Sequence, residues 1–322
     1  MKDYILKVVN LQKSYESTNS NKIFRKKTFK AINDVSFEVK RGEIVGLIGE
    51  SGCGKTTVGK IITNLIEADS GNVIFEDKNI TKLSKKDFKN IRSNIQMIFQ
   101  DSSSALNPQM KINRILKEAL FSINIVNKKE QEKIINEYII KVGLTKSYLE
   151  RYPHELSGGQ KQRICILLAL LTNPSFIVAD EVVSALDLSV QAQILNLLKA
   201  LQEELNLSML FISHNLSIVY YMSNRIIVMY MGEIVESGDC EEIYNNCKHP
   251  YTKLLLSSVL SLEDGRSIEE ELDEDKDDKK NNDACVFFDR CPYSRPICNE
   301  KKPENIVINN SHTIKCHFGG EI

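Results

Sequence analysis

Short apolar runs alternate along the chain with longer segments in which apolar residues recur at helical spacing. Glycine or polar residues directly follow three of these runs, at Ile44–Ile48, Phe176–Ala179 and Met209–Ile212. Continuous apolar runs bounded in this way are typical of strands buried in a sheet. Helical spacing is clearest at Val190–Leu205. Strand–helix alternation of this kind predicts an α/β core with a largely parallel sheet.

The amino-terminal part has strand candidates of hairpin character instead. They lie at Tyr4–Leu11, Ala31–Val39 and Asn72–Glu76, and Ala31–Val39 alternates apolar and polar residues as a half-buried strand does. The polar stretch Glu16–Phe29 predicts a long loop between the first two strands. Strands of this character ahead of a parallel core predict a mixed sheet.

A change in hydrophobic periodicity and a change in composition predict the domain organisation. Apolar residues recur at helical spacing over about residues 104–165, which predicts a helical subdomain inserted into the core. Leu262–Asp283 is mostly acidic with lysine and asparagine, so it cannot bury a core and predicts a flexible linker. The chain then divides into a core domain of residues 1–261, the linker 262–283 and a cysteine-rich module of residues 284–322. We expect the linker to isolate this module from the core domain.

The composition limits the classes of function. The 322 residues carry a net charge of −1, which argues against a general nucleic-acid binder because such proteins carry a basic excess. The polar start of the chain predicts no signal peptide. No apolar run approaches the ~18 residues that a membrane-spanning helix needs. Any role at a membrane should therefore come through a partner protein.

A glycine-rich segment with a lysine joins the first buried run to a helix. It fits the phosphate-binding pattern G-x-x-x-x-G-K-[ST], with the strand and the helix that this pattern requires on either side. Glycines let backbone N–H groups turn toward a phosphate, and the helix N-terminus adds its dipole. Lys55 would bind the β and γ phosphates, and Thr56 would ligate Mg²⁺. The predicted ATP-binding loop comprises Gly49, Glu50, Ser51, Gly52, Cys53, Gly54, Lys55, Thr56 and Thr57.

A second glycine motif lies at the start of another predicted helix. Ser157, Gly158, Gly159 and Gln160 offer a second nest of backbone N–H groups for an anion. One chain then carries two phosphate sites of different type. In a head-to-tail dimer, each ATP would lie between the loop of one subunit and the nest of the other.

The second motif, Leu156–Gln160, resembles the signature motif of ATP-binding-cassette (ABC) proteins. Phe176–Glu181 resembles the Walker B strand of that family. Asp180 would then hold Mg²⁺ from the end of the strand, and Glu181 would act as the general base toward the attacking water. The resemblance implies a P-loop NTPase fold, with a mixed sheet and the helical region as the signature subdomain.

Four single residues fit the same family by their place in the chain. Gln100 resembles the Q-loop glutamine, which touches Mg²⁺ and adjoins the face that meets the membrane subunits. His214 resembles the switch histidine that contacts the γ-phosphate. Asp187 closes a segment that resembles the D-loop. Tyr15 resembles the aromatic residue that stacks on adenine.

Finer features resemble the ATPases of oligopeptide and dipeptide permeases. They are Met97–Asp101, Leu106–Pro108, His249–Thr252 and Arg290–Pro292, and the long loop before Ala31 is similar to that of the F-type of the two ATPase subunits. Two positions depart from the family, since Val182 and Ser102 stand where many relatives have proline. The first departure bears on the D-loop, and the second on the contact with the membrane subunit.

Four of the eight cysteines lie in the last forty residues, with the spacing C-x5-C-x6-C-x17-C. Four thiols in a small, weakly cored segment suggest a metal staple, although no C-x-x-C knuckle of a structural zinc site is present. The resemblance implies a [4Fe–4S] cluster here, while zinc and unligated thiols stay open as alternatives. The candidate ligands are Cys285, Cys291, Cys298 and Cys316, with His312 and His317 as alternatives.

The resemblance implies the ATP-hydrolysing subunit of a peptide importer, with ATP and Mg²⁺ as cofactors. Its partners would be a homologous D-type ATPase subunit, two transmembrane permease subunits and, indirectly, an extracytoplasmic peptide-binding protein, with no nucleic acid. It would lie peripherally on the cytoplasmic face of the cell membrane. Nickel or another small solute is an alternative cargo within the same branch.

Two rival classes fit the sequence less well. A soluble cassette ATPase of DNA repair or translation would want long coiled coils, two cassettes or basic nucleic-acid surfaces. A small-molecule kinase does not need the nest at Ser157.

Overall fold

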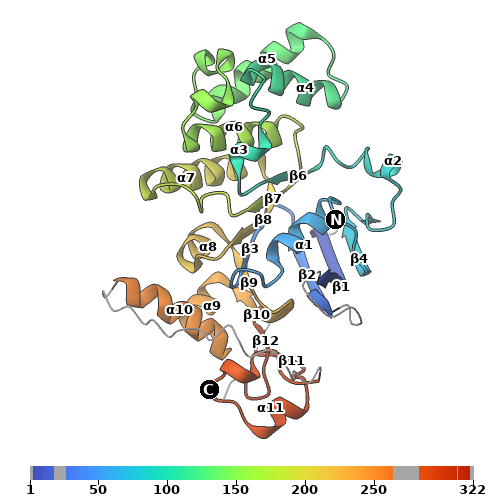
Figure 1. Cartoon of the computed structure of the whole chain (residues 1–322), viewed down its shortest axis with the longest axis vertical. Helices are drawn as coiled ribbons and strands as arrows, with labels where there is room; N and C mark the ends of the chain where they lie inside the picture. Colours follow the sequence, from blue (N-terminus) through green and yellow to red (C-terminus); the bar gives the residue numbers. More distant parts are fainter. Residues whose placement is uncertain (1–2, 18–26, 264–282, 310, 320–322) are drawn as a thin grey trace.

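The computed structural model describes residues 3–17, 27–263, 283–309 and 311–319, and its strands form two sheets (Figure 1). The larger sheet contains, in spatial order, β11 (Asn305–Val307), β12 (Thr313–Lys315), β10 (Glu233–Asp239), β9 (Arg225–Tyr230), β3 (Ile44–Ile48), β8 (Ser208–Ser213), β7 (Phe176–Asp180) and β6 (Ile95–Ile98). The smaller, antiparallel sheet contains β2 (Lys27–Lys40), β1 (Tyr4–Ser17), β4 (Ser70–Phe75) and β5 (Lys78–Asn79).

Helices flank the larger sheet, and the chain segment that connects β6 to β7 is mostly helical. The α-helices are α1 (Lys55–Ile62), α2 (Lys85–Phe88), α3 (Ser102–Ala105), α4 (Ile112–Ser122), α5 (Lys128–Lys141), α6 (Gly158–Leu170), α7 (Leu188–Leu205), α8 (Leu216–Met222), α9 (Cys240–Asn246), α10 (Pro250–Glu263) and α11 (Pro296–Glu300). Three short 3₁₀ turns are η1 (Lys146–Glu150), η2 (Pro153–Glu155) and η3 (Phe288–Arg290). Within the described ranges, none of these helices is both long and apolar enough to cross a membrane.

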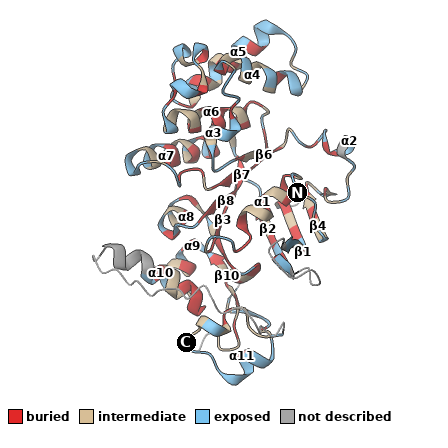
Figure 2. Ribbon diagram, viewed as in Figure 1, coloured by how far each residue is buried: buried red, intermediate tan, exposed pale blue. Residues whose placement is uncertain are grey.

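Strand β3 lies inside the larger sheet and is buried on both faces. It pairs in parallel with β8 on one side and β9 on the other. Ile44 and Ile48 pack into one hydrophobic cluster, whereas Val45 and Leu47 pack into a second, because successive side chains of a strand point to opposite faces. Figure 2 shows the resulting buried centre of the molecule. The continuous apolar run is thus explained, and the prediction of a mixed sheet with a parallel core is confirmed. The amino-terminal strands do not take part in it, since they form the separate smaller sheet; the antiparallel strands of the larger sheet are β10, β11 and β12.

The predicted loop Glu16–Phe29 is too long by two residues at its start and three at its end. Strand β1 continues through Ser17 and β2 begins at Lys27, with Tyr15 opposite Phe29. Residues 18–26 lie outside the described part of the chain. Polar residues continue the strands here because this end of the ribbon is exposed, so its side chains need not alternate.

The expectation that the linker isolates the cysteine-rich segment is wrong. Strand β12 pairs with β10, with Ile314 opposite Glu236, and so extends the larger sheet. Phe287 is 1% exposed and belongs to the hydrophobic cluster of the core domain. We call residues 283–319 the C-terminal module. Figure 1 shows it at the end of the molecule opposite α4 and α5, beside β10. An edge strand offers unpaired backbone groups, and the module covers them.

Candidate active site

The phosphate-loop segment occupies the turn between β3 and α1. Gly54 is the N-cap of α1 and has φ of 106°, where a Cβ would lie 2.3 Å from the carbonyl oxygen of Ala31. A Cβ at Gly49 would lie 2.2 Å from the carbonyl oxygen of Met229. Glycine is therefore required at both positions, since the loop is pressed against neighbouring backbone. No side chain caps the start of α1, and such a helix N-terminus suits an anionic ligand.

Lys55 is held inside this loop, with only 4% of its surface exposed. Its Nζ donates to the carbonyl oxygens of Gly49 and Glu50, at 2.7 and 2.8 Å. No ion pair of Lys55 with a carboxylate is found in the part of the chain that the structure describes. A buried ammonium with neutral partners leaves its charge uncompensated, which favours an anion in the site. The loop therefore fits the triphosphate of a nucleotide.

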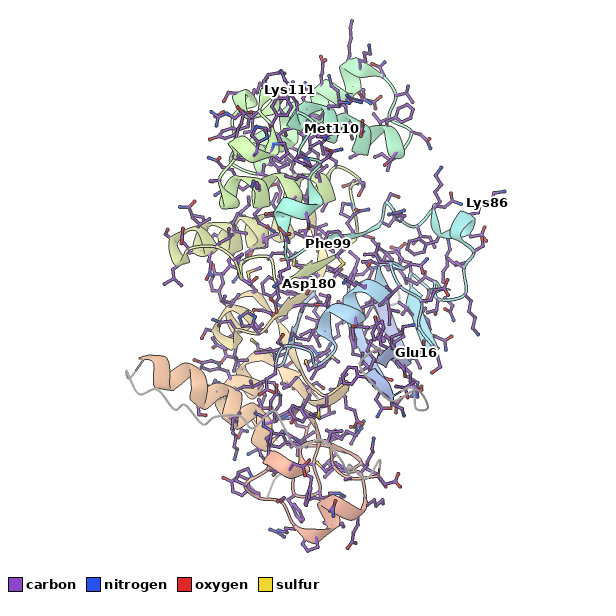
Figure 3. All side chains as sticks on the ribbon, in the orientation of Figure 1. Glu16, Lys86, Phe99, Met110, Lys111 and Asp180 are labelled. Atoms are coloured by element: carbon purple, nitrogen blue, oxygen red, sulfur yellow. The ribbon has the colours of Figure 1, made fainter. Side chains whose placement is uncertain are left out.

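Asp180 ends β7 and lies directly beside the loop. Thr56 Oγ1 donates to Asp180 Oδ1 at 3.1 Å, and Asp180 is 3% exposed. Burial raises the pKa of Asp180, and the hydrogen bond from Thr56 opposes that rise. Figure 3 shows Asp180 in the middle of the molecule, between the helical region and the lower part of the core domain. A hydroxyl and a carboxylate oxygen side by side are the donors that Mg²⁺ prefers, so the pair fits this ion.

Two side chains converge on the carboxylate of Glu181. Gln100 Nε2 donates to Glu181 Oε2 at 2.8 Å, and His214 Nδ1 lies 3.2 Å from Glu181 Oε1. The three residues follow β6, β7 and β8, which are adjacent and parallel, and carboxyl ends of parallel strands meet at one edge of a sheet. Glu181 has φ of 47°, a left-handed conformation that turns the chain away from β7. Non-glycine residues in this conformation are concentrated at functional sites.

Ser157 begins α6 with a capping box. Its side chain accepts from Gln160 N–H at 3.4 Å, and Gln160 Oε1 accepts from Ser157 N–H at 3.0 Å. A Cβ at Gly159 would lie 2.4 Å from Val190 Cγ1, so this glycine lets α6 approach α7 closely. Ser157 and Gly158 are exposed, and Figure 1 shows α6 well apart from α1. The structure therefore does not bring this motif to the phosphate loop of its own chain.

Comparisons with known proteins agree with this site. The ABC transporter family profile matches residues 32–184, and the profile of the oligopeptide/dipeptide transporter C-terminal region matches residues 235–298. The oligopeptide transport ATP-binding protein AppF of Bacillus subtilis is 42% identical over 297 residues, which cover 90% of this chain and 89% of AppF. This chain belongs to the ABC transporter family. As an ABC ATPase, it binds and hydrolyses ATP.

Other relatives of this ABC ATPase extend the comparison. The oligopeptide transport ATP-binding protein OppF of Haemophilus influenzae is 43% identical over 324 residues, covering 98% of this chain and 97% of OppF. The dimeric post-hydrolysis structure of the cassette MJ0796, with ADP and Pi, has a TM-score of 0.65 and 28% identity and covers 73% of this chain and 98% of its own. The structure of cbiO1 from Clostridium perfringens also has a TM-score of 0.65, with 25% identity, and covers 82% and 97%.

Two further predicted residues of this ABC ATPase stay apart from the others. Tyr15 lies on β1 and is 43% exposed, with Lys13 Nζ 5.7 Å from its ring centroid. Asp187 is the N-cap of α7 and is exposed, with no capping bond from its side chain. Both are accessible to a ligand or to a second subunit, and their roles stay predictions.

The structure does not support the iron–sulfur interpretation of the four C-terminal cysteines. Over residues 3–17, 27–263, 283–309 and 311–319, no group of three or more His, Cys, Asp or Glu side chains is arranged to hold a metal ion. His312 and His317 have partners of their own in Glu236 and the carbonyl of Lys301.

Sequence reasoning missed two residues that contact the phosphate loop. Tyr251 OH accepts a hydrogen bond from Glu50 N–H at 2.8 Å, and the Arg290 guanidinium binds the Glu50 carboxylate. They follow Glu50 by 201 and 240 positions. No local pattern predicts contacts over such separations, and both residues were named only as parts of segments that resemble a family.

Proposed function

We propose that this chain is the ATP-hydrolysing subunit of an oligopeptide importer, and that Glu181 activates water in its catalytic site. The convergence of Gln100 and His214 on Glu181, beside the Thr56–Asp180 pair, carries the catalytic assignment. The peptide cargo is supported by relatives at 42% and 43% identity that are named oligopeptide transport ATP-binding proteins.

Each group of the site has a task in this reaction. Lys55 and the backbone N–H groups at the start of α1 bind the β and γ phosphates. Thr56 and Asp180 would hold Mg²⁺, which would neutralise phosphate charge when bound. A Glu181 carboxylate oxygen accepts a proton from the attacking water. The contacts from Gln100 and His214 fix that carboxylate in place before the substrate arrives.

A second cassette completes the site in this proposal. Ser157 and Gly158 are exposed at the start of α6, and this helix lies away from the phosphate loop of its own chain. Backbone N–H groups at a helix start bind phosphate well, and the similar cassette MJ0796 forms a dimer with ADP and Pi. We propose that a homologous D-type subunit supplies the nest for this loop, and that this chain supplies the nest for its partner.

The membrane partners dock near Gln100 in this proposal. Phe99 and Gln100 are both exposed, with Phe99 at 39%, and Figure 3 shows Phe99 between the helical region and Asp180. A side chain that binds Glu181 while bordering an exposed apolar residue can pass a movement of the membrane subunits to the catalytic carboxylate. The subunit would then sit on the cytoplasmic face of the membrane, beside two permease subunits.

The test is peptide-stimulated ATP hydrolysis in a reconstituted transporter. The subunit is assembled in liposomes with its D-type partner, two permease subunits and the peptide-binding protein, and ATP hydrolysis is measured with peptides or with Ni²⁺. We expect peptides to raise ATP hydrolysis and Ni²⁺ to leave it unchanged. Stimulation by Ni²⁺ alone would replace the peptide cargo with nickel, and a cassette without ATP hydrolysis would refute the catalytic proposal.

A further inference from the structure

The C-terminal module reaches into the phosphate loop through one arginine. Arg290 Nη1 and Nη2 donate to the two carboxylate oxygens of Glu50, at 2.8 and 2.9 Å. Glu50 is the second residue of the loop, directly after Gly49. Such a two-point contact fixes both the position and the orientation of the carboxylate. The module therefore holds a side chain of the loop.

Aromatic rings of both regions orient this arginine. Its guanidinium lies 5.5 Å from the ring centroid of Tyr230 and 5.7 Å from that of Phe287. The Tyr230 and Phe287 rings meet edge to face at 5.1 Å, and Tyr251, which is fully buried, lies 4.6 Å from Tyr230. The Tyr251 hydroxyl accepts from Glu50 N–H. Tyr251 thus holds the backbone of Glu50, and Arg290, which lies against the same aromatic cluster, holds its side chain.

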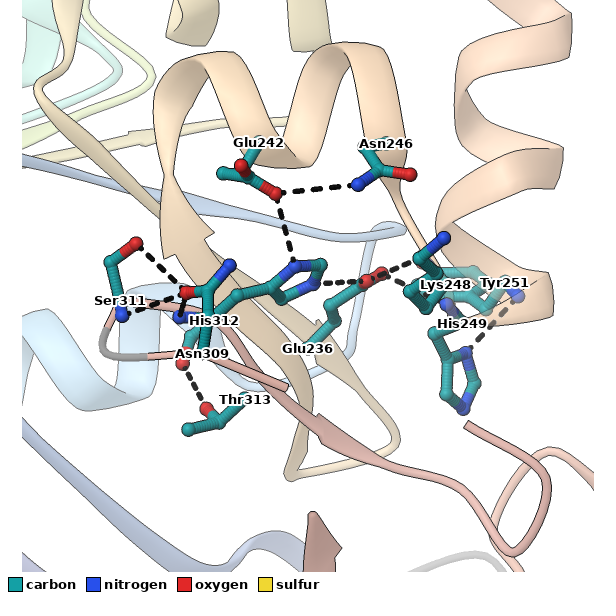
Figure 4. A network of polar contacts seen from close by, with 11 residues as sticks. Glu236, Glu242, Asn246, Lys248, His249, Tyr251, Asn309, Ser311, His312 and Thr313 are labelled. Atoms are coloured by element: carbon teal, nitrogen blue, oxygen red, sulfur yellow. Dashed lines mark hydrogen bonds and ion pairs between the residues drawn. The ribbon is translucent and has the colours of Figure 1, made fainter. Parts of the chain in front are cut away.

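The module is fixed to the core domain independently of Arg290. His312 Nε2 lies 2.8 Å from Glu236 Oε1, with both side chains fully buried (Figure 4). Lys302 and Lys315 bind the two carboxylate oxygens of Glu233, at 2.8 and 2.6 Å. Arg290 is therefore presented to the loop from a docked body and does not have to anchor the module.

The charge of Glu50 gives this contact a consequence for the ligand. A carboxylate within a loop that binds a polyanion repels it, and a paired guanidinium removes most of that repulsion. We propose that Arg290 is a positioning residue that compensates and fixes Glu50, so that nucleotide binding and docking of the C-terminal module are coupled. This inference rests on the phosphate-binding role proposed above for the loop. By linkage, bound nucleotide should in turn strengthen docking of the module.

The test compares single and double variants of the pair. Nucleotide affinity of the full-length subunit is measured by calorimetry with MgATP for Arg290→Gln, Glu50→Gln and the double variant. We expect Arg290→Gln to weaken binding by about 3- to 10-fold, because the pair is partly exposed and screened. Glu50→Gln is the reference in which the carboxylate charge is already absent, and the double variant should bind MgATP with the same Kd as Glu50→Gln.

Two matched variants separate this role from general loosening of the module. Lys302→Gln removes a contact of the module that does not involve the loop. The Kd of this variant for MgATP should therefore differ from that of wild type by less than about two-fold. Arg290→Lys keeps the charge without the two-point contact, and should bind more tightly than Arg290→Gln and more weakly than wild type.

Several results would overturn the inference. These are an unchanged Kd in Arg290→Gln, an effect of Arg290→Gln that persists when Glu50 is already Gln, or an equal loss in Lys302→Gln. Amide exchange of residues 285–319 supplies a second readout, since MgATP should slow it in wild type but not in Glu50→Gln, whose module is unaltered. Equal protection in both proteins would also overturn it. A Lys55→Ala variant that binds MgATP like wild type would instead refute the phosphate-loop role itself.

Discussion

The catalytic edge of the larger sheet and the interface of the C-terminal module both bury charge, but they satisfy it differently. At the catalytic edge, Lys55 donates to two carbonyl oxygens and to the Cys53 sulfur, which are all uncharged, and Asp180 accepts from a hydroxyl. At the module interface, Glu233 has two lysines. Burial would push the pKa of Glu233 up, but Lys302 and Lys315 outweigh it and hold that pKa below its ordinary value.

This difference separates a site for a ligand from a structural contact. A buried charge without an opposite charge is costly. At the catalytic edge, binding of a charged ligand therefore reduces this cost. A buried charge with its partners in the same chain needs no ligand, and removing one partner is the costly change. Substitutions at the catalytic edge should therefore change ATP binding and turnover, and those at the module interface should change stability.

The largest effect should come from Glu181→Gln. The amide keeps the shape of the side chain but cannot accept the proton of water, so ATP turnover should fall by about 10²- to 10⁴-fold while MgATP affinity survives. Turnover and nucleotide retention in the assembled transporter check this expectation. Glu203→Gln, an exposed carboxylate of α7, is the matched control. Near-normal turnover would show that Glu181 is not the base.

The next effect should come from Lys55→Ala, which removes the uncompensated charge of the loop. Charge-assisted hydrogen bonds contribute about 1.5–3 kcal/mol, so MgATP affinity should fall by roughly 10- to 150-fold. Calorimetric titration of the full-length subunit measures the change, with Lys128→Ala, at an exposed position at the start of α5, as the control. Unchanged MgATP affinity would mean that Lys55 is a structural residue. The catalytic edge would then not differ from the module interface in the way described.

Glu233→Gln tests the other side of the comparison. It leaves two lysines beside a neutral amide, which should lower the free energy of unfolding by about 1–3 kcal/mol. MgATP affinity should change less than about two-fold, because Arg290 still reaches Glu50 while most molecules keep the module docked. Urea denaturation and calorimetry provide both numbers. Glu300→Gln, an exposed carboxylate of the same module, should leave both unchanged. A loss of affinity without a loss of stability would contradict the structural role of Glu233.

The smallest effect should be the pH dependence of His312→Gln. The hydrogen bond to Glu236 raises the pKa of His312 above its ordinary 6.5, with a further contribution from Glu242. The stabilisation is therefore fully present below pH 6.5 and is lost as pH rises through the raised value. Burial lowers the pKa of His249 to about 4. The contribution of neutral His249 to the free energy of unfolding is therefore lost as pH falls from 6.5 toward that value.

Comparing wild type with the variant at each pH isolates His312, because both proteins keep His249. The difference in the free energy of unfolding should be largest below pH 6.5 and should shrink as pH rises above it. Urea denaturation across this range measures it, and His317→Gln is the matched control. A difference that stays constant with pH would mean that His312 contributes packing and not charge.

The sequence by itself determined the features that depend on neighbouring residues. The loop from Gly49 to Thr57 carries its own chemistry and conformation, since strand, glycines, lysine and helix follow one another directly. Asp180 and Glu181 were recognisable because a buried apolar strand precedes them. Gln100 and His214 were identified through the family resemblance, and the physical reason that both contact Glu181 is the order β6-β7-β8. The pattern of apolar residues within one strand does not predict which strands lie beside it in the sheet.

Only the tertiary structure decided how the C-terminal module relates to the active site. Composition around the linker suggested an isolated module held by a metal, whereas β12 pairs with β10 and Arg290 binds Glu50. Those two residues are 240 positions apart, and any of the 42 lysines and arginines could have met that carboxylate. Long-range ion pairs and edge-strand pairing depend on which surfaces the completed core brings together. The residues that neighbour Arg290 or β12 along the chain do not determine those surfaces.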